Sequence, residues 1–128
     1  MIEENKVIVT SADNIPKQNV PAGKNTSIQV LIGSDVAPTF AMRRFIMKPG
    51  GGMPNHTNTV EHEQFVIQGR ANVGIGNKVY DVKKGDVVFI PKNIPHWYSV
   101  KGEEPFEFLC LVPNMPDNIE ILDKSNNS

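Results

Sequence analysis

The sequence predicts an all-β protein built from many short strands. No long stretch keeps the apolar period of about 3.6 residues that a helix requires, and turn-forming glycine and proline residues recur every few positions. Gly76-Asn77 stands between two alternating runs, which is a strong hairpin signal. Short strands of this spacing fit a sandwich, a jelly roll or a small barrel, and the pattern alone does not choose among them.

The first expected strands lie on either side of a polar segment. Residues 6–10 and 27–32 contain the β-branched side chains that strands favour, whereas the stretch 13–25 between them is polar and holds Pro16 and Pro21. A third strand over 39–47 should end at a turn formed by the proline and glycines of 49–52.

The remaining strands should follow one another through short turns. They are expected over residues 63–68, 71–75, 78–82, 86–90, 97–100 and 106–112, with turns at 69, 76–77, 84–85, 91–95 and 101–102. In the last strand Glu107 should face solvent, so the alternation places Phe106, Phe108, Cys110 and Val112 in the interior.

Length and charge limit the organisation and the partners of the chain. Its 128 residues suit one domain, with a core over about residues 27–113, an N-terminal arm over 1–26 and a flexible tail over 123–128. The 13 basic and 14 acidic residues give a net charge of −1, which favours neither nucleic acid nor an anionic membrane as partner.

The ends and the cysteine count indicate a cytoplasmic protein. Glu3 and Glu4 stand where a secretory signal would be basic, and no apolar run is long enough to span a membrane. The single cysteine, Cys110, allows no internal disulfide, as suits a reducing compartment.

The chain has three histidines, and each lies near an expected strand end. His56, Asn58 and His62 differ by even numbers, so a locally extended backbone would direct them to one face. His96 opens a strand directly after a turn that has proline on both sides, which would restrict its position. Imidazole is the commonest metal ligand, and three imidazoles leave coordination positions open. The pattern therefore predicts a metal site.

Two motifs resemble those of the cupin superfamily. The first is Gly50, five residues, His56-Thr57-Asn58, three residues, His62, six residues and Gly69. The second is Gly85, five residues, Pro91-Lys92-Asn93, two residues and His96. The resemblance implies a double-stranded β-helix, the cupin jelly-roll barrel, in a single domain.

The departures from the cupin pattern fall in the ligand set. Asn58 replaces the second histidine of the first motif, and His62 replaces its glutamate. With a histidine in place of the motif glutamate, the chain resembles small single-domain cupins of the cupin 2 conserved-barrel type, whose Mn is held by four histidines. Asn58 either ligates weakly through its carbonyl oxygen or leaves the position to water. The resemblance implies one divalent ion, Mn, Fe, Ni or Zn, at His56, Asn58, His62 and His96.

The two-residue period of the strands predicts a mostly apolar pocket beside this ion. Its polar or reactive members would be Arg43, Tyr98 and Cys110, which are the candidate catalytic residues. An arginine inside a small barrel needs an anionic partner, supplied by the protein or by a ligand.

Three functions are compatible with such a pocket. The first is a dioxygenase-like oxidoreductase acting on a small molecule, because no side chain stands out as a dedicated general base. The second is a sugar or carboxylate isomerase or lyase, and the third is a non-catalytic module that binds or senses a metal or small ligand. Small cupins usually pair, and the strand expected at 6–10 offers an edge to a neighbour, so we expect a homodimer.

Overall fold

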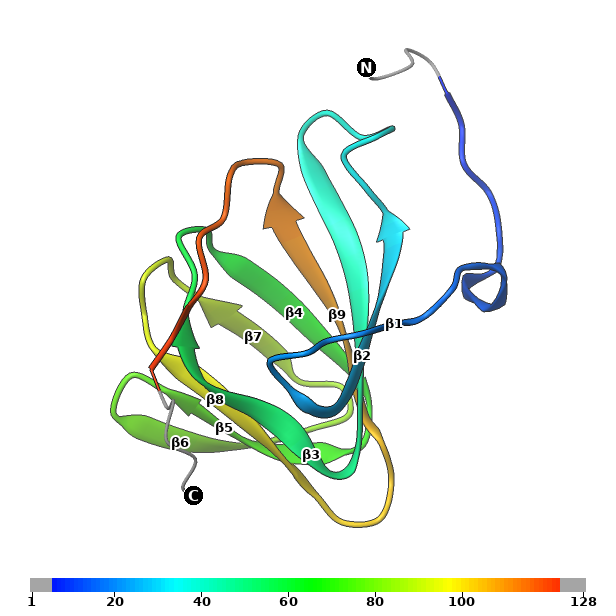
Figure 1. The fold of residues 1–128 in the computed structure, drawn as a ribbon. Helices are drawn as coiled ribbons and strands as arrows, with labels where there is room; N and C mark the ends of the chain where they lie inside the picture. Colours follow the sequence, from blue (N-terminus) through cyan, green and yellow to red (C-terminus); the bar gives the residue numbers. More distant parts are fainter. Residues whose placement is uncertain (1–5, 123–128) are drawn as a thin grey trace.

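Antiparallel strands make up nearly all regular structure of residues 6–122, the part of the chain that this computed structural model describes (Figure 1). The expected tail at 123–128 lies outside these residues. A single 3-10 turn, η1 (Ala12–Asn14), precedes the first strand. The strands are β1 (Gln18–Asn19), β2 (Lys24–Ile32), β3 (Phe40–Thr57), β4 (His62–Gln68), β5 (Arg70–Ile75), β6 (Lys78–Lys83), β7 (Val87–Ile90), β8 (His96–Lys101), β9 (Phe106–Pro113) and β10 (Glu120–Ile121). The predicted all-β class is confirmed.

The ten described strands belong to one curled sheet with the order β6-β5-β8-β3-β9-β4-β7, to which β2 and β10 add beside β3 and β1 beside β2. Sequential neighbours are often separated in this order, because β8 lies between β5 and β3, and β9 lies between β3 and β4. This curling around a common interior gives the half-barrel that Figure 1 shows.

β3 does not end at the turn expected over residues 49–52, and this expectation is wrong. The strand continues and changes partners: its first part pairs with β2 and β9, and from Gly52 onward it pairs with β8. The intervening residues form a bulge, since the partner of Thr26 is Met47 whereas the partner of Lys24 is Gly52. Gly52 suits this place because a side chain there would strike the carbonyl oxygen of Tyr98 on β8.

The core lies on the inner face of the curled sheet. Phe106, Phe108, Cys110 and Val112 are all buried, as the alternation of β9 predicts. Phe108 stacks with Phe45 of β3 and with Tyr98 of β8, at ring-centroid distances of 5.2 and 5.3 Å. Burying side chains of this size contributes about 1.5–3 kcal/mol each.

Glu107 does not face solvent as expected. Glu107 is only 8% exposed, because Arg44 of the neighbouring strand donates to the Glu107 carboxylate through Nε at 3.1 Å and through Nη2. Arg44 Nη1 also donates to Gln29 Oε1 at 3.2 Å. The alternation placed Glu107 on the outer face correctly, but these ionic and amide partners cover it there.

The prediction of a strand over residues 6–10 is wrong for a single copy of the chain. The structure has no strand there, and Val7 and Val9 are 81% and 91% exposed. The later part of the arm does contact the sheet: Gln29 Nε2 donates to the carbonyl oxygens of Ala12 and Ile15, each at 2.8 Å. β1 pairs with Ser27 and Ile28 of β2. Figure 1 shows the first described residues beside the barrel, where Ile8, Val9 and Thr10 line a hollow together with residues of β2 and β3.

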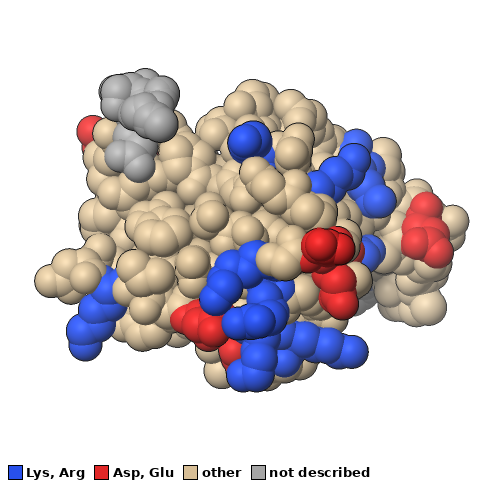
Figure 2. Space-filling model, turned by 90° about the horizontal axis from the view of Figure 1, so that it is seen from below, with Lys and Arg blue, Asp and Glu red and all other residues tan. Residues whose placement is uncertain are grey.

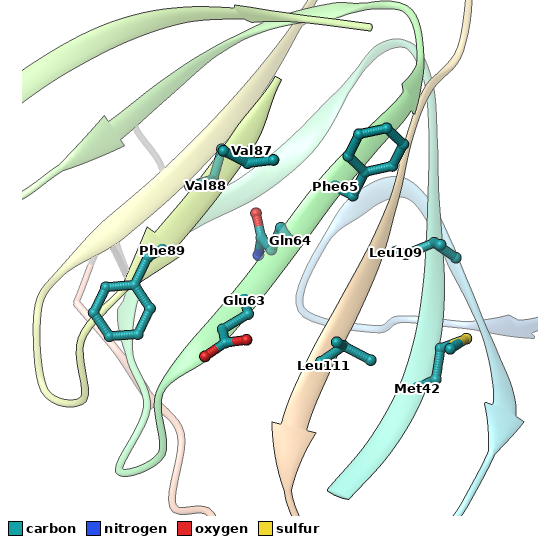
Figure 3. Close-up of a pocket in the computed structure, with 9 residues that line it drawn as sticks. All are labelled: Met42, Glu63, Gln64, Phe65, Val87, Val88, Phe89, Leu109 and Leu111. Atoms are coloured by element: carbon teal, nitrogen blue, oxygen red, sulfur yellow. The ribbon is translucent and has the colours of Figure 1, made fainter. Parts of the chain in front are cut away.

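The outer face of β4, β7 and β9 carries an apolar hollow of about 480 Å³ (Figure 3). Seven of its nine lining residues belong to the outward phase of the strands, and the exposed Phe65 is one of them. The outward side chains are Met42, Glu63, Phe65, Val87, Phe89, Leu109 and Leu111. None of the candidate metal or catalytic residues lines this hollow.

Charged side chains of both signs occur together on the surface seen in Figure 2. Exposed ion pairs join Asp81 to Arg70 and Lys101, and Asp86 to Lys83, around the ends of β5 to β8. Exposed pairs of this kind contribute little to stability. No helix among residues 6–122 is long and apolar enough to cross a membrane.

Candidate metal centre

The curled sheet encloses a cavity of about 280 Å³, and all seven candidate residues line it. They come from four strands and one loop: Arg43 and His56 from β3, His62 from β4, His96 and Tyr98 from β8, Cys110 from β9, and Asn58 from the loop after β3. The remaining walls are mostly apolar, with Phe45, Met47, Met53 and Phe108 among them. Sequence positions far apart are therefore brought to one small space.

His56 and His96 lie opposite each other on neighbouring strands, and the Nδ1 of each lies near the carbonyl oxygen two residues before it. They are register partners in the pairing of β3 with β8, and their ring centroids are 4.2 Å apart. His56 Nδ1 lies 2.7 Å from the carbonyl oxygen of Pro54, and His96 Nδ1 lies 2.9 Å from that of Ile94. A carbonyl oxygen only accepts, so each Nδ1 carries the proton and each Nε2 keeps a free lone pair.

His62 approaches from the other side of the cavity. Its ring centroid is 5.7 Å from that of His96. Its Nδ1 lies 3.2 Å from Cys110 Sγ and 3.4 Å from Arg43 Nη2. The guanidinium can only donate, whereas the sulfur can accept, so these two neighbours favour opposite tautomers of the imidazole.

Three buried polar atoms of residues that line this cavity have no hydrogen-bond partner within residues 6–122: His62 Nε2, Asn58 Oδ1 and Arg43 Nε. Buried polar atoms are normally satisfied, so an unpartnered nitrogen and an unpartnered oxygen indicate room for a further group. The chemistry of the imidazole nitrogens with the amide oxygen fits a divalent transition metal. As they stand, no three or more His, Cys, Asp or Glu side chains of residues 6–122 are grouped closely enough to hold an ion.

Burial keeps the three imidazoles neutral. It is the largest cause that lowers the pKa of His56, the pKa of His62 to about 3 and the pKa of His96 to about 4. For His62 the Arg43 charge adds to this effect, and for His96 the charge of His56 does. Neutral imidazole is the form that binds metal ions.

Arg43, Tyr98 and Cys110 form the polar side of the cavity. Arg43 Nη2 donates to Cys110 Sγ at 3.4 Å, and its guanidinium carbon lies 5.2 Å from the centre of the Phe45 ring. Tyr98 Oη accepts a 2.7 Å hydrogen bond from Gln64 Nε2. Burial raises the pKa of the Tyr98 phenol and of the Cys110 thiol, so both stay protonated at neutral pH.

Asp117 and Ile119 are among the lining residues that were not predicted from the sequence. They follow the last long strand, in a segment that returns across the barrel and pairs with β3 through β10. A two-residue strand leaves no periodic pattern, so no sequence signal marks this return. Gln64 lies two residues after His62 on β4, so it shares the inward phase of that strand, and it lines the cavity.

Comparison with known proteins identifies relatives of the chain. The family model described as Cupin domain matches residues 43–112. The protein MJ1618 of Methanocaldococcus jannaschii is 33% identical over 67 residues, which are 51% of this chain and 54% of that protein. An acireductone dioxygenase of Alcanivorax borkumensis is 32% identical over 69 residues, which are 51% of this chain and 38% of that enzyme. The match thus spans about half or less of these relatives.

A solved structure extends the similarity to almost the whole chain. The polyketide cyclase RemF from Streptomyces resistomycificus superposes with a TM-score of 0.82 at 25% sequence identity. The match covers 93% of this chain and 89% of that one. The similarity therefore includes the segments on both sides of the family match.

Proposed function

The chain belongs to the cupin domain family, and on this basis we propose that it is a metal-dependent, dioxygenase-like oxidoreductase acting on a small molecule inside its barrel. The observation that supports this proposal most is the cavity itself, which three neutral imidazoles line and where His62 Nε2 and Asn58 Oδ1 are buried without a hydrogen-bond partner. The similarity to an acireductone dioxygenase supports the reaction class, although the match covers 38% of that enzyme.

One divalent ion, Mn, Fe, Ni or Zn, would be held by His56, His62 and His96 through Nε2 and by Asn58 through Oδ1. Metal to nitrogen distances are about 2.0–2.1 Å in such sites. The His62 ring lies farther from His96 than the His56 ring does, so binding requires the side chains to turn toward a common point. When bound, the ion would supply open coordination positions to O2 or to a substrate oxygen.

The chain's own residues would bind and orient the substrate. Phe45, Met47 and Phe108 exclude water from one side of it. Arg43 would hold an anionic group, and Tyr98, which accepts from Gln64, keeps its own hydroxyl proton available as a donor. Cys110 would orient the His62 imidazole, because its Sγ lies 3.2 Å from His62 Nδ1.

Arg43 also favours a second candidate, lyase or isomerase chemistry on a carboxylate or sugar acid. Within residues 6–122 no carboxylate forms an ion pair with its guanidinium, and its buried Nε has no partner. A charged group left in this state suits an anionic ligand. The cavity could also hold such a ligand without turnover, as a binding or sensing module would.

Oxygen uptake separates these functions. Protein loaded with Fe²⁺ or Mn²⁺ should consume O2 with at least one member of a panel of small diketone and aromatic compounds, and His96→Ala should abolish the uptake. Glu63→Gln is the matched control, because Glu63 neighbours His62 but lies on the outer face. Turnover of a carboxylate or sugar acid without O2 would support the second candidate instead. Binding without any turnover would contradict both enzymatic functions.

A further inference from the structure

The segment that follows β9 forms one wall of the candidate metal centre. Within it, β10 pairs with His56 and Thr57 of β3, and Leu122 N donates to the carbonyl oxygen of Asn55 at 2.8 Å. Asp117 and Ile119, which precede β10, line the cavity. We call residues 114–122 the C-terminal strap. It brings a carboxylate to a site whose sequence motifs supply none.

Asp117 is held firmly against the loop that carries Asn58. Its Oδ2 accepts from Asn58 Nδ2 at 3.0 Å, and its Oδ1 accepts from the backbone N–H of Thr59 at 2.9 Å. The strap is fixed a second time, because Asn118 N donates to Thr59 Oγ1 at 2.9 Å. Both carboxylate oxygens are thus engaged by one short loop.

This contact fixes the orientation of the Asn58 amide. An ionised carboxylate only accepts hydrogen bonds, so the NH2 end of Asn58 must face Asp117 and the carbonyl oxygen must face away. That oxygen, Asn58 Oδ1, is buried and has no hydrogen-bond partner. Asn58 lines the same cavity as the three imidazoles. The amide is therefore held with its ligand atom free.

We propose that Asp117 is a positioning residue of the metal centre, which holds Asn58 as an oxygen ligand in the place where the cupin motif has a histidine. This inference rests on the proposed function, because it assumes that the cavity binds a divalent ion. Donation of an N–H to a carboxylate polarises the amide and increases the electron density on its oxygen. Asp117 thereby makes a weak neutral ligand a better one.

Asp117 would also favour a cation directly. Asp117 lines the same cavity as His56 and His96, so the strap adds a carboxylate to the wall beside these imidazoles. A site of three nitrogens and one oxygen beside a carboxylate suits Mn²⁺ or Fe²⁺ better than a site of four imidazoles would.

Chelator competition for Mn²⁺ tests the role of Asp117 with the full-length protein. Asp117→Ala should weaken Mn²⁺ binding about 10-fold or more, the usual effect of losing a partner that orients a ligand. Asn58→Ala should weaken it similarly. If Asp117 acts through Asn58, the double variant should lose less than the product of the two single effects. Asp117→Asn, which keeps an oxygen that can accept from Asn58, should retain more affinity than Asp117→Ala.

Thr59→Val is the matched control for the strap. It removes the hydroxyl that accepts from Asn118 and donates to Asp117 Oδ1 at 3.4 Å, but it leaves the hydrogen bonds of Asp117 with Asn58 and with the backbone N–H of Thr59. The Thr59→Val variant should bind Mn²⁺ with nearly the affinity of wild type and, when loaded with Co²⁺, should have nearly the same visible spectrum. Asp117→Ala loaded with Co²⁺ should instead have the visible spectrum of Asn58→Ala. Circular dichroism checks that each variant folds.

The failures of the two proposals differ. Wild-type protein that takes up none of Mn²⁺, Fe²⁺, Ni²⁺ and Zn²⁺ would contradict metal binding itself and with it the role of Asp117. Wild-type protein that binds one of these ions, together with an Asp117→Ala variant of unchanged affinity for that ion, would overturn the positioning role alone. Independent effects of Asp117→Ala and Asn58→Ala, which multiply in the double variant, would also overturn it, because Asp117 would then act without Asn58.

Discussion

At the scale of single residues, the atom opposite each imidazole Nδ1 decides whether that ring can bind an ion through Nε2. His56 and His96 face carbonyl oxygens, which settle their tautomers. His62 faces Cys110 and Arg43 instead, and only donation from its Nδ1 to the sulfur leaves Nε2 free. Cys110 would therefore favour the His62 tautomer that can bind a metal through Nε2. Burial raises the pKa of the Cys110 thiol, so the thiol itself stays protonated and unreactive.

Replacement of Cys110 tests this role. Cys110→Ala removes the acceptor and leaves Arg43 as the neighbour of Nδ1, so the His62 tautomer with a protonated Nε2 should gain population. Divalent metal affinity should fall about 10-fold, the lower end of the range for such partners. Cys110→Ser keeps an acceptor and should bind metal nearly as well as wild type in the same titration. Equal affinities of both variants and wild type would count against the role.

Some cavity residues could be predicted from the sequence and others could not, for physical reasons. Motif spacing and strand alternation predicted that His56, His62 and His96 would share a space with Arg43, Tyr98 and Cys110, and they line one cavity. Asp117 was missed because its approach depends on the path of the strap, which no local pattern encodes. Glu107 was expected in solvent, because alternation predicts a face but not the partners that cover it.

At the scale of elements, long strands were predictable and short or bulged ones were not. The expected strands of residues 63–112 agree with β4 to β9 to within one residue at each end. β1 and β10 have two residues each, too few to show a period. The glycines after Met47 read as a turn but form a bulge, because β8 offers the second part of β3 a new partner.

The close packing of β5 on β8 makes Gly74 a sensitive position of the sheet. Gly74 and Trp97 are register partners, and a side chain at Gly74 would collide with the indole ring. Gly74→Ala should therefore lower the free energy of unfolding by about 1–3 kcal/mol, as overpacking does. Val79 is the register partner of Gly74 on β6 and is exposed. Val79→Ala should therefore change the free energy of unfolding by about 0.5 kcal/mol or less. Urea unfolding measures both changes.

Equal stabilities of Gly74→Ala and Val79→Ala would contradict this packing. Trp97 also neighbours His96 in the chain, so displacement of the indole in Gly74→Ala should shift the tryptophan fluorescence. The chain has one tryptophan, which makes that signal specific.

At the scale of the whole molecule, we propose that the exposed arm pairs with a second copy of the chain. Val7 and Val9 are among the most exposed apolar side chains described, in a stretch whose sequence favours a strand. Beyond Ile28, β2 has a strand neighbour on one side only within residues 6–122. An arm from a neighbouring molecule could pair along this edge and gain the hydrogen bonds that it lacks in a single chain.

We therefore expect a homodimer in light scattering. The double substitution Val7→Lys with Val9→Lys should yield a monomer, because it places two charges where apolar side chains would be buried. Val79→Lys changes an exposed valine on β6 and should leave the dimer intact. A monomeric wild-type protein, or a double variant that stays dimeric, would contradict the pairing of the arm.

The metal content of purified protein tests the central claim most directly. After loading with Mn²⁺, Fe²⁺, Ni²⁺ or Zn²⁺ and removal of free metal, elemental analysis of wild-type protein and of Glu63→Gln should give about one ion per chain for at least one of these metals. His96→Ala should retain almost none of that metal, since it removes one of the three imidazoles. Wild-type protein free of all four metals, or a His96→Ala variant with the wild-type content, would contradict the account.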